Sequence, residues 1–315
     1  MFIYKKNNNY TMYNNIMEEL EIEPTKKDYA VCIIGQLRAT KTSIDKLYEN
    51  LIDVLDADLY LLIQKTNTDI DNDIELYDKK VIKKVIYDPP KDIESKFVNY
   101  NKLLKHDNYI CYASLQMYYN AYMMGDLFGD VLEKNYRYVI LTRSDFYHLF
   151  PFPNILQLHC TDDTLWHYEI NSYGGINGTL MCVPSKYIKF YLKLFKSFLN
   201  DSKNIRMLNS VPFNDDYPGL RLNSEVYLKM LIDINRSTKK WNTGKLRSNA
   251  FISASSLQEI TTWGAIMYDD TNKLYYKYET QYRDALLGLK EYNEELKKWT
   301  YHYDMNNNTK TILLS

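Results

Sequence analysis

The sequence predicts an α/β domain in which a mostly parallel sheet is flanked by helices. Two apolar runs, at 29–34 and 58–64, are nearly continuous, as is typical of strands that are covered on both faces. An amphipathic helix is expected between them, at 41–57, because its apolar residues fall on one stripe. The order of strands and helices that follows allows the long crossovers that parallel strands need.

The later elements are predicted from the same patterns. A strand at 80–90 ends at a pair of prolines, and a helix at 112–133 carries an interruption between Gly125 and Gly129. A strand at 138–142 precedes Pro151 and Pro153. Beyond them the pattern predicts strands at 164–170, 178–184 and 246–255, helices at 185–199, 222–235 and 278–299, and a polar surface loop at 200–219. Ser185 is the expected N-cap of the helix that it opens.

One domain accounts for most of the chain. Residues 1–28 are rich in Asn and Lys and predict a loose polar arm with a short helix near 16–20. Residues 29–260 form the predicted α/β domain. Residues 261–315 are expected to be a C-terminal helical extension that packs on the same domain.

The composition of the 315 residues excludes several classes of partner. The chain has 39 Lys and Arg against 40 Asp and Glu, a formal charge of -1, so no general basic field exists for nucleic acid or anionic membranes. No segment approaches the roughly 18 apolar residues of a membrane span, and no signal peptide is evident. With four cysteines that lack CxxC spacing, this predicts a cytoplasmic protein with reduced thiols. The oligomeric state cannot be inferred from the sequence.

The abundance of Tyr, at 31 residues, together with Asn, Lys and Ile is typical of an A+T-rich genome. This bias is consistent with a protist or a large cytoplasmic virus. The tyrosines themselves are expected to fill core and surface positions, as aromatic side chains generally do.

Several large enzyme classes lack their motifs in this chain. There is no GxxxxGK[ST] or GxGxxG loop to hold phosphates, no GxSxG for a serine hydrolase, and no HExxH among the five histidines.

Asp145, in the segment "YVILTRSDFYHLFPFP", is the carboxylate that strand context singles out. It follows the strand at 138–142, and ligands of open α/β sheets bind at the carboxyl ends of strands. A hard cation such as Mg²⁺ or Mn²⁺ takes oxygen ligands and often shares a substrate's phosphates, so one such Asp can suffice. The alternative is a strand-end aspartate that pairs with Arg143 and has no ligand.

The segment "IIGQLRAT" places Gly35, Gln36 and Arg38 at the end of the first strand. Glycine permits a ligand to approach the backbone closely, and the planar guanidinium of Arg38 suits a diphosphate. With a carboxylate on a nearby strand end, these residues suggest a nucleotide-binding edge.

Four segments, taken in order, resemble a group of GT-A-type glycosyltransferases found in bacterial surface-polysaccharide clusters, protists and large DNA viruses. The resemblance covers roughly residues 29–235, and the order of its short motifs carries most of the weight. The segments are "CIIGQLRATKTSIDKLYENLIDVLDADLYLLIQ", "YRYVILTRSDF", "YGGINGTLMCVPSKYIKFYLKLF" and "NSEVYLKMLI".

This resemblance implies a Rossmann-type GT-A sheet that holds a nucleotide-sugar donor at its carboxyl edge. An acidic DXD motif in such enzymes binds a divalent metal that bridges the diphosphate, which would put Asp145 on Mn²⁺ or Mg²⁺. Here Arg143 occupies the first acidic position of that motif. Arg143 would then either neutralise phosphate charge itself or pair with Asp145, so the resemblance leaves metal dependence open.

Breaking an anomeric C–O bond releases a diphosphate, so cations that meet the developing phosphate charge lower the barrier. An inverting enzyme also needs a carboxylate that takes the proton of the acceptor hydroxyl. Glu225, Asp163 and Glu169 are the candidates, and Glu225 matches the "NSE" segment of the resembling proteins. As an alternative, Glu225 is simply a first-turn acid stabilised by the helix dipole.

Gly174 and Gly175, in "YGGING", could let the backbone approach the donor sugar, although a glycine-rich turn between strands explains them as well. Together the residues predict transfer of a sugar from a nucleotide-diphosphate donor, UDP-sugar by default, to a hydroxyl acceptor. The alternative is a non-catalytic module that binds glycans or nucleotide sugars.

Overall fold

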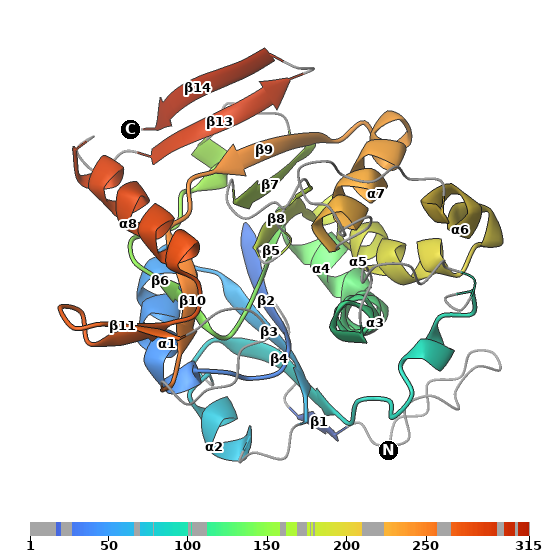
Figure 1. Cartoon of the computed structure of the whole chain (residues 1–315), viewed down its shortest axis with the longest axis horizontal. Helices are drawn as coiled ribbons and strands as arrows, with labels where there is room; N and C mark the ends of the chain where they lie inside the picture. Colours follow the sequence, from blue (N-terminus) through green and yellow to red (C-terminus); the bar gives the residue numbers. More distant parts are fainter. Residues whose placement is uncertain are drawn as a thin grey trace.

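A large mixed sheet with helices on both faces organises the chain and confirms the predicted α/β class (Figure 1). In this computed structural model, the sheet has ten strands within the described residues, in the order β1-β4-β3-β2-β5-β8-β7-β9-β13-β14. The structure describes residues 17–19, 27–65, 70–77, 79–99, 102, 112–157, 162–168, 175–176, 178, 180–209, 224–256, 266–294, 299–305 and 308–314.

Four neighbouring strands of this sheet are parallel, as the apolar runs predict: β4 (Val81–Tyr87), β3 (Asp58–Gln64), β2 (Tyr29–Gly35) and β5 (Tyr138–Thr142). All seven residues of β3 are buried, because helices cover both faces of the sheet at this strand. The carboxyl ends of these four strands therefore meet at one edge of the sheet.

The remaining strands of the sheet add mainly antiparallel neighbours. Strand β8 pairs antiparallel with both β5 and β7, whereas β7 and β9 are parallel. The hairpin of β13 and β14 extends the sheet beyond β9, and β1 closes the other side on β4. Their bounds are β1 Met17–Glu19, β7 Thr164–Tyr168, β8 Met181–Pro184, β9 Asn242–Leu246, β13 Trp299–Met305 and β14 Asn308–Leu314.

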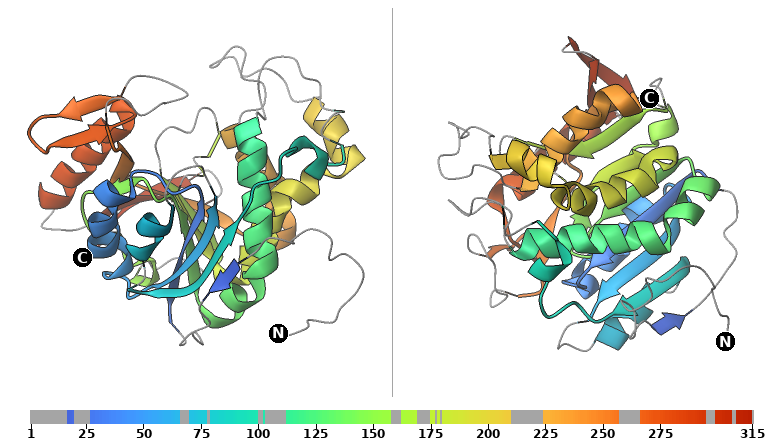
Figure 2. Two further views of the ribbon diagram at one scale, coloured as in Figure 1. Left: turned by 90° about the horizontal axis from the view of Figure 1, so that it is seen from below. Right: turned by 90° about the vertical axis from the view of Figure 1, so that its right-hand side faces the viewer.

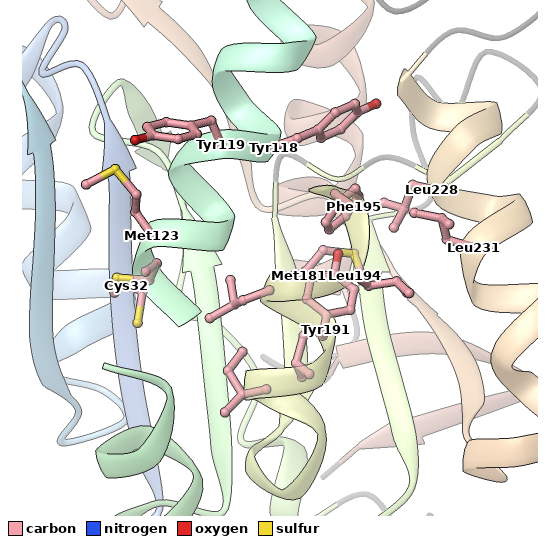
Figure 3. Close-up of a cluster of buried hydrophobic side chains, with 14 of the residues drawn as sticks. Cys32, Tyr118, Tyr119, Met123, Met181, Tyr191, Leu194, Phe195, Leu228 and Leu231 are labelled. Atoms are coloured by element: carbon pink, nitrogen blue, oxygen red, sulfur yellow. The ribbon is translucent and has the colours of Figure 1, made fainter. Parts of the chain in front are cut away.

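Two hydrophobic cores lie on the two faces of the sheet. The first packs alternate residues of β2 and β3 against α3, α4, α5 and α7, which Figure 2 shows together on one side. Within it, Tyr118 of α3 stacks on Phe195 of α5 with ring centroids 5.0 Å apart (Figure 3). The second packs the intervening residues of the same strands against α1 and the π-helical turn η1. These helices are α1 Thr40–Leu47, η1 Tyr48–Ile52, α3 Tyr112–Leu127, α4 Gly129–Asn135, α5 Ser185–Leu199 and α7 Ser224–Lys239.

A second sheet, ordered β11-β12-β10-β6, lies beside α1 and carries α8 on its outer face (Figure 1). The chain passes from the first sheet to the second between β5 and β6, over only three residues. The elements of this unit are β6 Phe146–His148, β10 Ala250–Ala254, β11 Met267–Asp269, β12 Leu274–Tyr276 and α8 Glu279–Glu294.

Most of the elements predicted between residues 29 and 199 are present in the structure. Helix α5 has the predicted bounds, and Phe128 separates α3 from α4 where the glycines predict an interruption. The expected N-cap is wrong, because Pro184 occupies that position and no side chain caps the helix. The remaining short helices are α2 Ile70–Glu75, α6 Ser202–Asn209, η2 Glu94–Lys96 and η4 Ile155–Gln157.

Three segments differ from expectation. The arm carries strand β1 rather than a short helix, because Met17–Glu19 pairs with the open edge of β4. Helix α6 lies inside the predicted loop at 200–219. After α8, the chain adds the β13–β14 hairpin to the first sheet rather than ending as a helix. For both β1 and the β13–β14 hairpin, pairing with an existing edge of the sheet outweighs the local sequence preference. Among the described helices none is both long and apolar enough to cross a membrane.

Candidate active site

The loop after β2 and the loop after β5 lie at the same edge and are hydrogen-bonded to each other. Strands β2 and β5 are parallel neighbours, with Ile33 opposite Thr142. Between the loops, the backbone N–H of Arg38 donates to Ser144 Oγ at 2.9 Å, and Ser144 Oγ donates to the Gln36 carbonyl at 3.2 Å. The two segments that the sequence singled out therefore form one structural unit.

The backbone at the end of β2 has a special conformation. Gly35 has a φ of 108°, which L side chains rarely adopt. A Cβ at this position would come within 3.5 Å of Asn120 Nδ2. Beyond it, Arg38 is exposed and its guanidinium donates to Gln36 Oε1 through Nε at 3.2 Å and Nη2 at 2.5 Å. Gln36 thus holds the Arg38 side chain on the loop.

Arg143 and Asp145 form a bidentate ion pair. Arg143 Nε donates to Asp145 Oδ1 and Arg143 Nη2 donates to Asp145 Oδ2, both at 2.7 Å. The Asp145 side chain is only 1% exposed, whereas that of Arg143 is 35% exposed. Two parallel charge-assisted hydrogen bonds fix the plane of the guanidinium, and part of the Arg143 side chain lies at the surface.

A third charged group, which the sequence did not suggest, belongs to the same cluster. Lys277, directly after β12, is 5% exposed, and its Nζ lies 3.9 Å from Asp145 Oδ2. Burial alone would raise the pKa of the Asp145 carboxyl. The charge and hydrogen bonds of Arg143, together with the charges of Lys277 and Arg38, outweigh burial and hold that pKa below its usual value.

The side chain of Asp145 does not fit a divalent cation. Both of its oxygens accept hydrogen bonds from Arg143, and Lys277 lies behind one of them. A metal ion would have to displace a guanidinium from a nearly inaccessible carboxylate and stay next to two cations. Within the described ranges, no three His, Cys, Asp or Glu side chains are grouped so that they could hold a metal.

Glu225 and Gly175 come together at the same edge as Arg143. Strand β8 is antiparallel to β5, with Met181 opposite Leu141, so the residues just before β8 lie where β5 ends. Among them, the Ile176 N–H donates to the Glu225 carbonyl at 3.0 Å. A Cβ on Gly175 would lie 2.0 Å from the Glu225 carbonyl carbon, so only glycine permits this close approach.

The surroundings of the Glu225 carboxyl group raise its pKa. Burial raises its pKa, and the hydrogen bond from Ser224 Oγ to Glu225 Oε2, at 2.8 Å, opposes that rise in part. A carboxylate whose pKa is moved toward neutrality is better suited to accept a proton. Its position at the first turn of α7 also agrees with the dipole explanation.

Asp163 lies at the opposite edge of the sheet, so it does not join the other candidate site residues. It precedes β7, whose first residues lie beside the end of β8 and hence beside the start of β5. The five residues of β5 separate the two edges by roughly 15 Å. There Asp163 pairs with Lys186 Nζ at 2.5 Å and accepts a hydrogen bond from Tyr187 Oη at 2.5 Å. It stabilises the start of α5.

Gly174 and Glu169 lie outside the described residues. Ser144 and Lys277 are the contributors that sequence reasoning missed. Ser144 lies between Arg143 and Asp145 in the sequence, and its small hydroxyl side chain is the signal for a hydrogen bond between the loops after β2 and β5. Lys277 follows a three-residue strand in the C-terminal segment, and no local pattern marks it.

Comparisons with known proteins leave the chain without a recognised family. No protein-family model and no curated protein matches it. Among solved structures, mouse xyloside xylosyltransferase 1 in its apo form is similar over 69% of this chain and 84% of that one, with 11% identity and a TM-score of 0.37. The apo glycosyltransferase GlyE of Streptococcus pneumoniae is similar over 69% of this chain and 50% of that one, with 14% identity and a TM-score of 0.29. Similarity of this degree carries no information on the reaction, so the case for function rests on the site itself.

Proposed function

We propose that this protein transfers a sugar from a nucleotide-diphosphate sugar, a UDP-sugar by default, to the hydroxyl group of an acceptor such as a glycan. The observation that carries the proposal is the joined pair of loops at the carboxyl edge of the parallel strands. These loops present two arginines, Arg38 and Arg143, and Glu225 lies at the same edge. Cations and a carboxylate at one strand edge are what sugar transfer from a diphosphate requires.

In the reaction, the anomeric C–O bond to the diphosphate breaks and the diphosphate leaves with the bonding electrons. The guanidinium groups of Arg38 and Arg143 stabilise the growing negative charge of that leaving group. Because Asp145 fixes the plane of Arg143 beforehand, little reorganisation is needed when the charge develops.

The acceptor hydroxyl oxygen forms the new bond to the anomeric carbon and must lose its proton. Glu225 takes this proton as general base. The structural features that support the role are its raised pKa and its fixed backbone, which Ile176 and Gly175 hold at the start of α7. A base in this role implies inversion at the anomeric carbon.

A panel of nucleotide sugars, assayed for release of the nucleoside diphosphate in the presence of hydroxyl acceptors, tests the activity. Glu225→Gln should lose turnover and keep donor affinity, because the amide cannot accept the proton. Glu279→Gln is the matched control, since Glu279 is also a first-turn glutamate, of α8, but is partly exposed and pairs with Arg283. A fully active Glu225→Gln would remove the base role, and no turnover with any donor would remove the activity.

One observation favours a second function, that of a module which binds nucleotide sugars or glycans without catalysis. The Asp145 carboxylate, which matches a metal-binding motif, is nearly inaccessible, and both of its oxygens accept hydrogen bonds from Arg143. If a nucleotide sugar raises the melting temperature of the protein but is never turned over, the protein has this second function.

A further inference from the structure

Three charged side chains from two sheets converge beside the proposed donor site. Arg143 and Asp145 lie between β5 and β6, and Lys277 follows β12 in the second sheet. The Arg143 fork contacts both carboxylate oxygens at 2.7 Å, and Lys277 Nζ lies 3.9 Å from Oδ2. The C-terminal segment thus supplies a charge to this edge.

The backbone holds these groups in place. Ser253 of β10 donates to the Asp145 carbonyl from its N–H at 2.9 Å and from its Oγ at 3.0 Å. On the other side of β10, the Lys277 N–H donates to the Ile252 carbonyl at 3.0 Å. Both ends of the Lys277–Asp145 contact are therefore fixed to one strand, and the cluster has little freedom to rearrange.

Exposure rises from the inner to the outer group of the cluster. The side chains of Asp145, Lys277 and Arg143 are 1%, 5% and 35% exposed. Of the three side chains only that of Arg143 reaches solvent to any extent, and its guanidinium is fixed on Asp145 through Nε and Nη2. A ligand would therefore contact Arg143. Lys277, which is buried behind Asp145, would attract the ligand through its charge without contacting it.

The charges of the cluster decide which ligand it suits. Arg143, Lys277 and Asp145 together carry a charge of about +1, and Arg38 on the adjoining loop raises this to about +2. A net positive charge repels a divalent cation and attracts a diphosphate.

We propose that the diphosphate of the donor binds here without a divalent metal, on Arg143 and Arg38, and that Lys277 is the positioning residue that supplies the positive charge behind them. This inference rests on the proposed function for the identity of the ligand. It makes the unit of β10, β12 and α8 a required part of the donor site.

Calorimetric titration of the full chain with UDP and with inorganic pyrophosphate, in EDTA and then in Mn²⁺, tests the inference. We expect both probes to bind in EDTA, with affinities that change less than about twofold on adding Mn²⁺. Lys277→Met keeps most of the length of the side chain and removes its charge, so we expect UDP affinity to fall about tenfold through the lost Coulomb attraction. Lys277→Arg restores the charge and should recover most of the affinity.

Lys273→Met is the matched control, because Lys273 directly precedes β12, as Lys277 directly follows it, but is 69% exposed and pairs with Asp270 at 2.7 Å. It should bind UDP as the unaltered chain does. Binding that requires Mn²⁺, or unchanged affinity in Lys277→Met, would overturn the inference. If Lys277→Met does not fold, the EDTA titration of the unaltered chain decides alone.

The two proposals fail in different ways. Donor turnover that stops in EDTA and returns with Mn²⁺ would overturn the metal-free site and leave the glycosyltransferase proposal standing. An absence of turnover with every donor, combined with pyrophosphate binding in EDTA, would overturn the enzymatic proposal and leave the anion site standing.

Discussion

The ion pair of Arg143 and Asp145 makes a prediction about stability that can be worked from the structure. Asp145→Asn preserves the shape of the side chain and removes its charge. Arg143, bound at 2.7 Å, and Lys277, at 3.9 Å, would then lie beside a neutral amide. Removing one partner of a buried pair costs about 3–5 kcal/mol. Because Arg143 is 35% exposed and can turn toward water, whereas Lys277 is 5% exposed and cannot, we expect a loss of about 3 kcal/mol.

Urea denaturation, with linear extrapolation of the free energy of unfolding, measures this loss. Asp162→Asn provides the comparison, since Asp162 pairs with Arg137 at 3.4 Å but is 68% exposed, and such surface pairs contribute at most about 1 kcal/mol. In the double variant Asp145→Asn/Lys277→Met, removal of the inaccessible cation should recover at least about 1 kcal/mol. If Asp145→Asn costs no more than Asp162→Asn, the cluster is not the buried charge pair described above.

Two further perturbations test the surroundings of the site. Gly175→Ala places a methyl group 2.0 Å from the Glu225 backbone and should displace the start of α7. We therefore expect turnover to fall at least about tenfold. Gly178→Ala is the control, because its methyl group meets only Leu228 Cδ2, at 3.0 Å, and should be tolerated. Burial lowers the pKa of His148 and of His167 to about 4, so below pH ~6.5 the unfolded chain takes up protons that the folded chain refuses. We expect each histidine to remove about 3 kcal/mol of stability between pH 6.5 and pH 4, and urea titrations at several pH values, with His148→Leu showing about half the fall, would measure this. A flat profile over that range would contradict the burial of both rings.

The parallel strands and the helices between them could be predicted because their signals are local. The apolar run of β3 and the stripe of α5 each specify an element without reference to the rest of the chain. Strands β1 and β13 could not be predicted, because each forms by pairing with a distant edge, β4 and β9 respectively.

The candidate site was predictable to the extent that parallel strands end at a common edge. That rule brought Gly35 and Arg38 to the same place as Arg143 and Asp145, as the hydrogen bonds of Ser144 confirm. It gave no support to Asp163, which precedes β7 rather than following a strand and so lies at the other edge. It missed Lys277 because that contact joins positions 132 residues apart, the difference between 277 and 145.

Asp145 lies between the two sheets, where a structural role for its backbone and a positioning role for its carboxylate do not exclude each other. Its carbonyl accepts two hydrogen bonds from Ser253 of β10, which couples the second sheet to the end of β5. Its carboxylate fixes the guanidinium of Arg143, whose side chain reaches solvent. A residue that only joined the sheets would not need a cation held in one plane at the strand edge. A metal ligand would need free oxygens. Asp145 therefore anchors Arg143, and in the proposed function the contact with the diphosphate falls to Arg143.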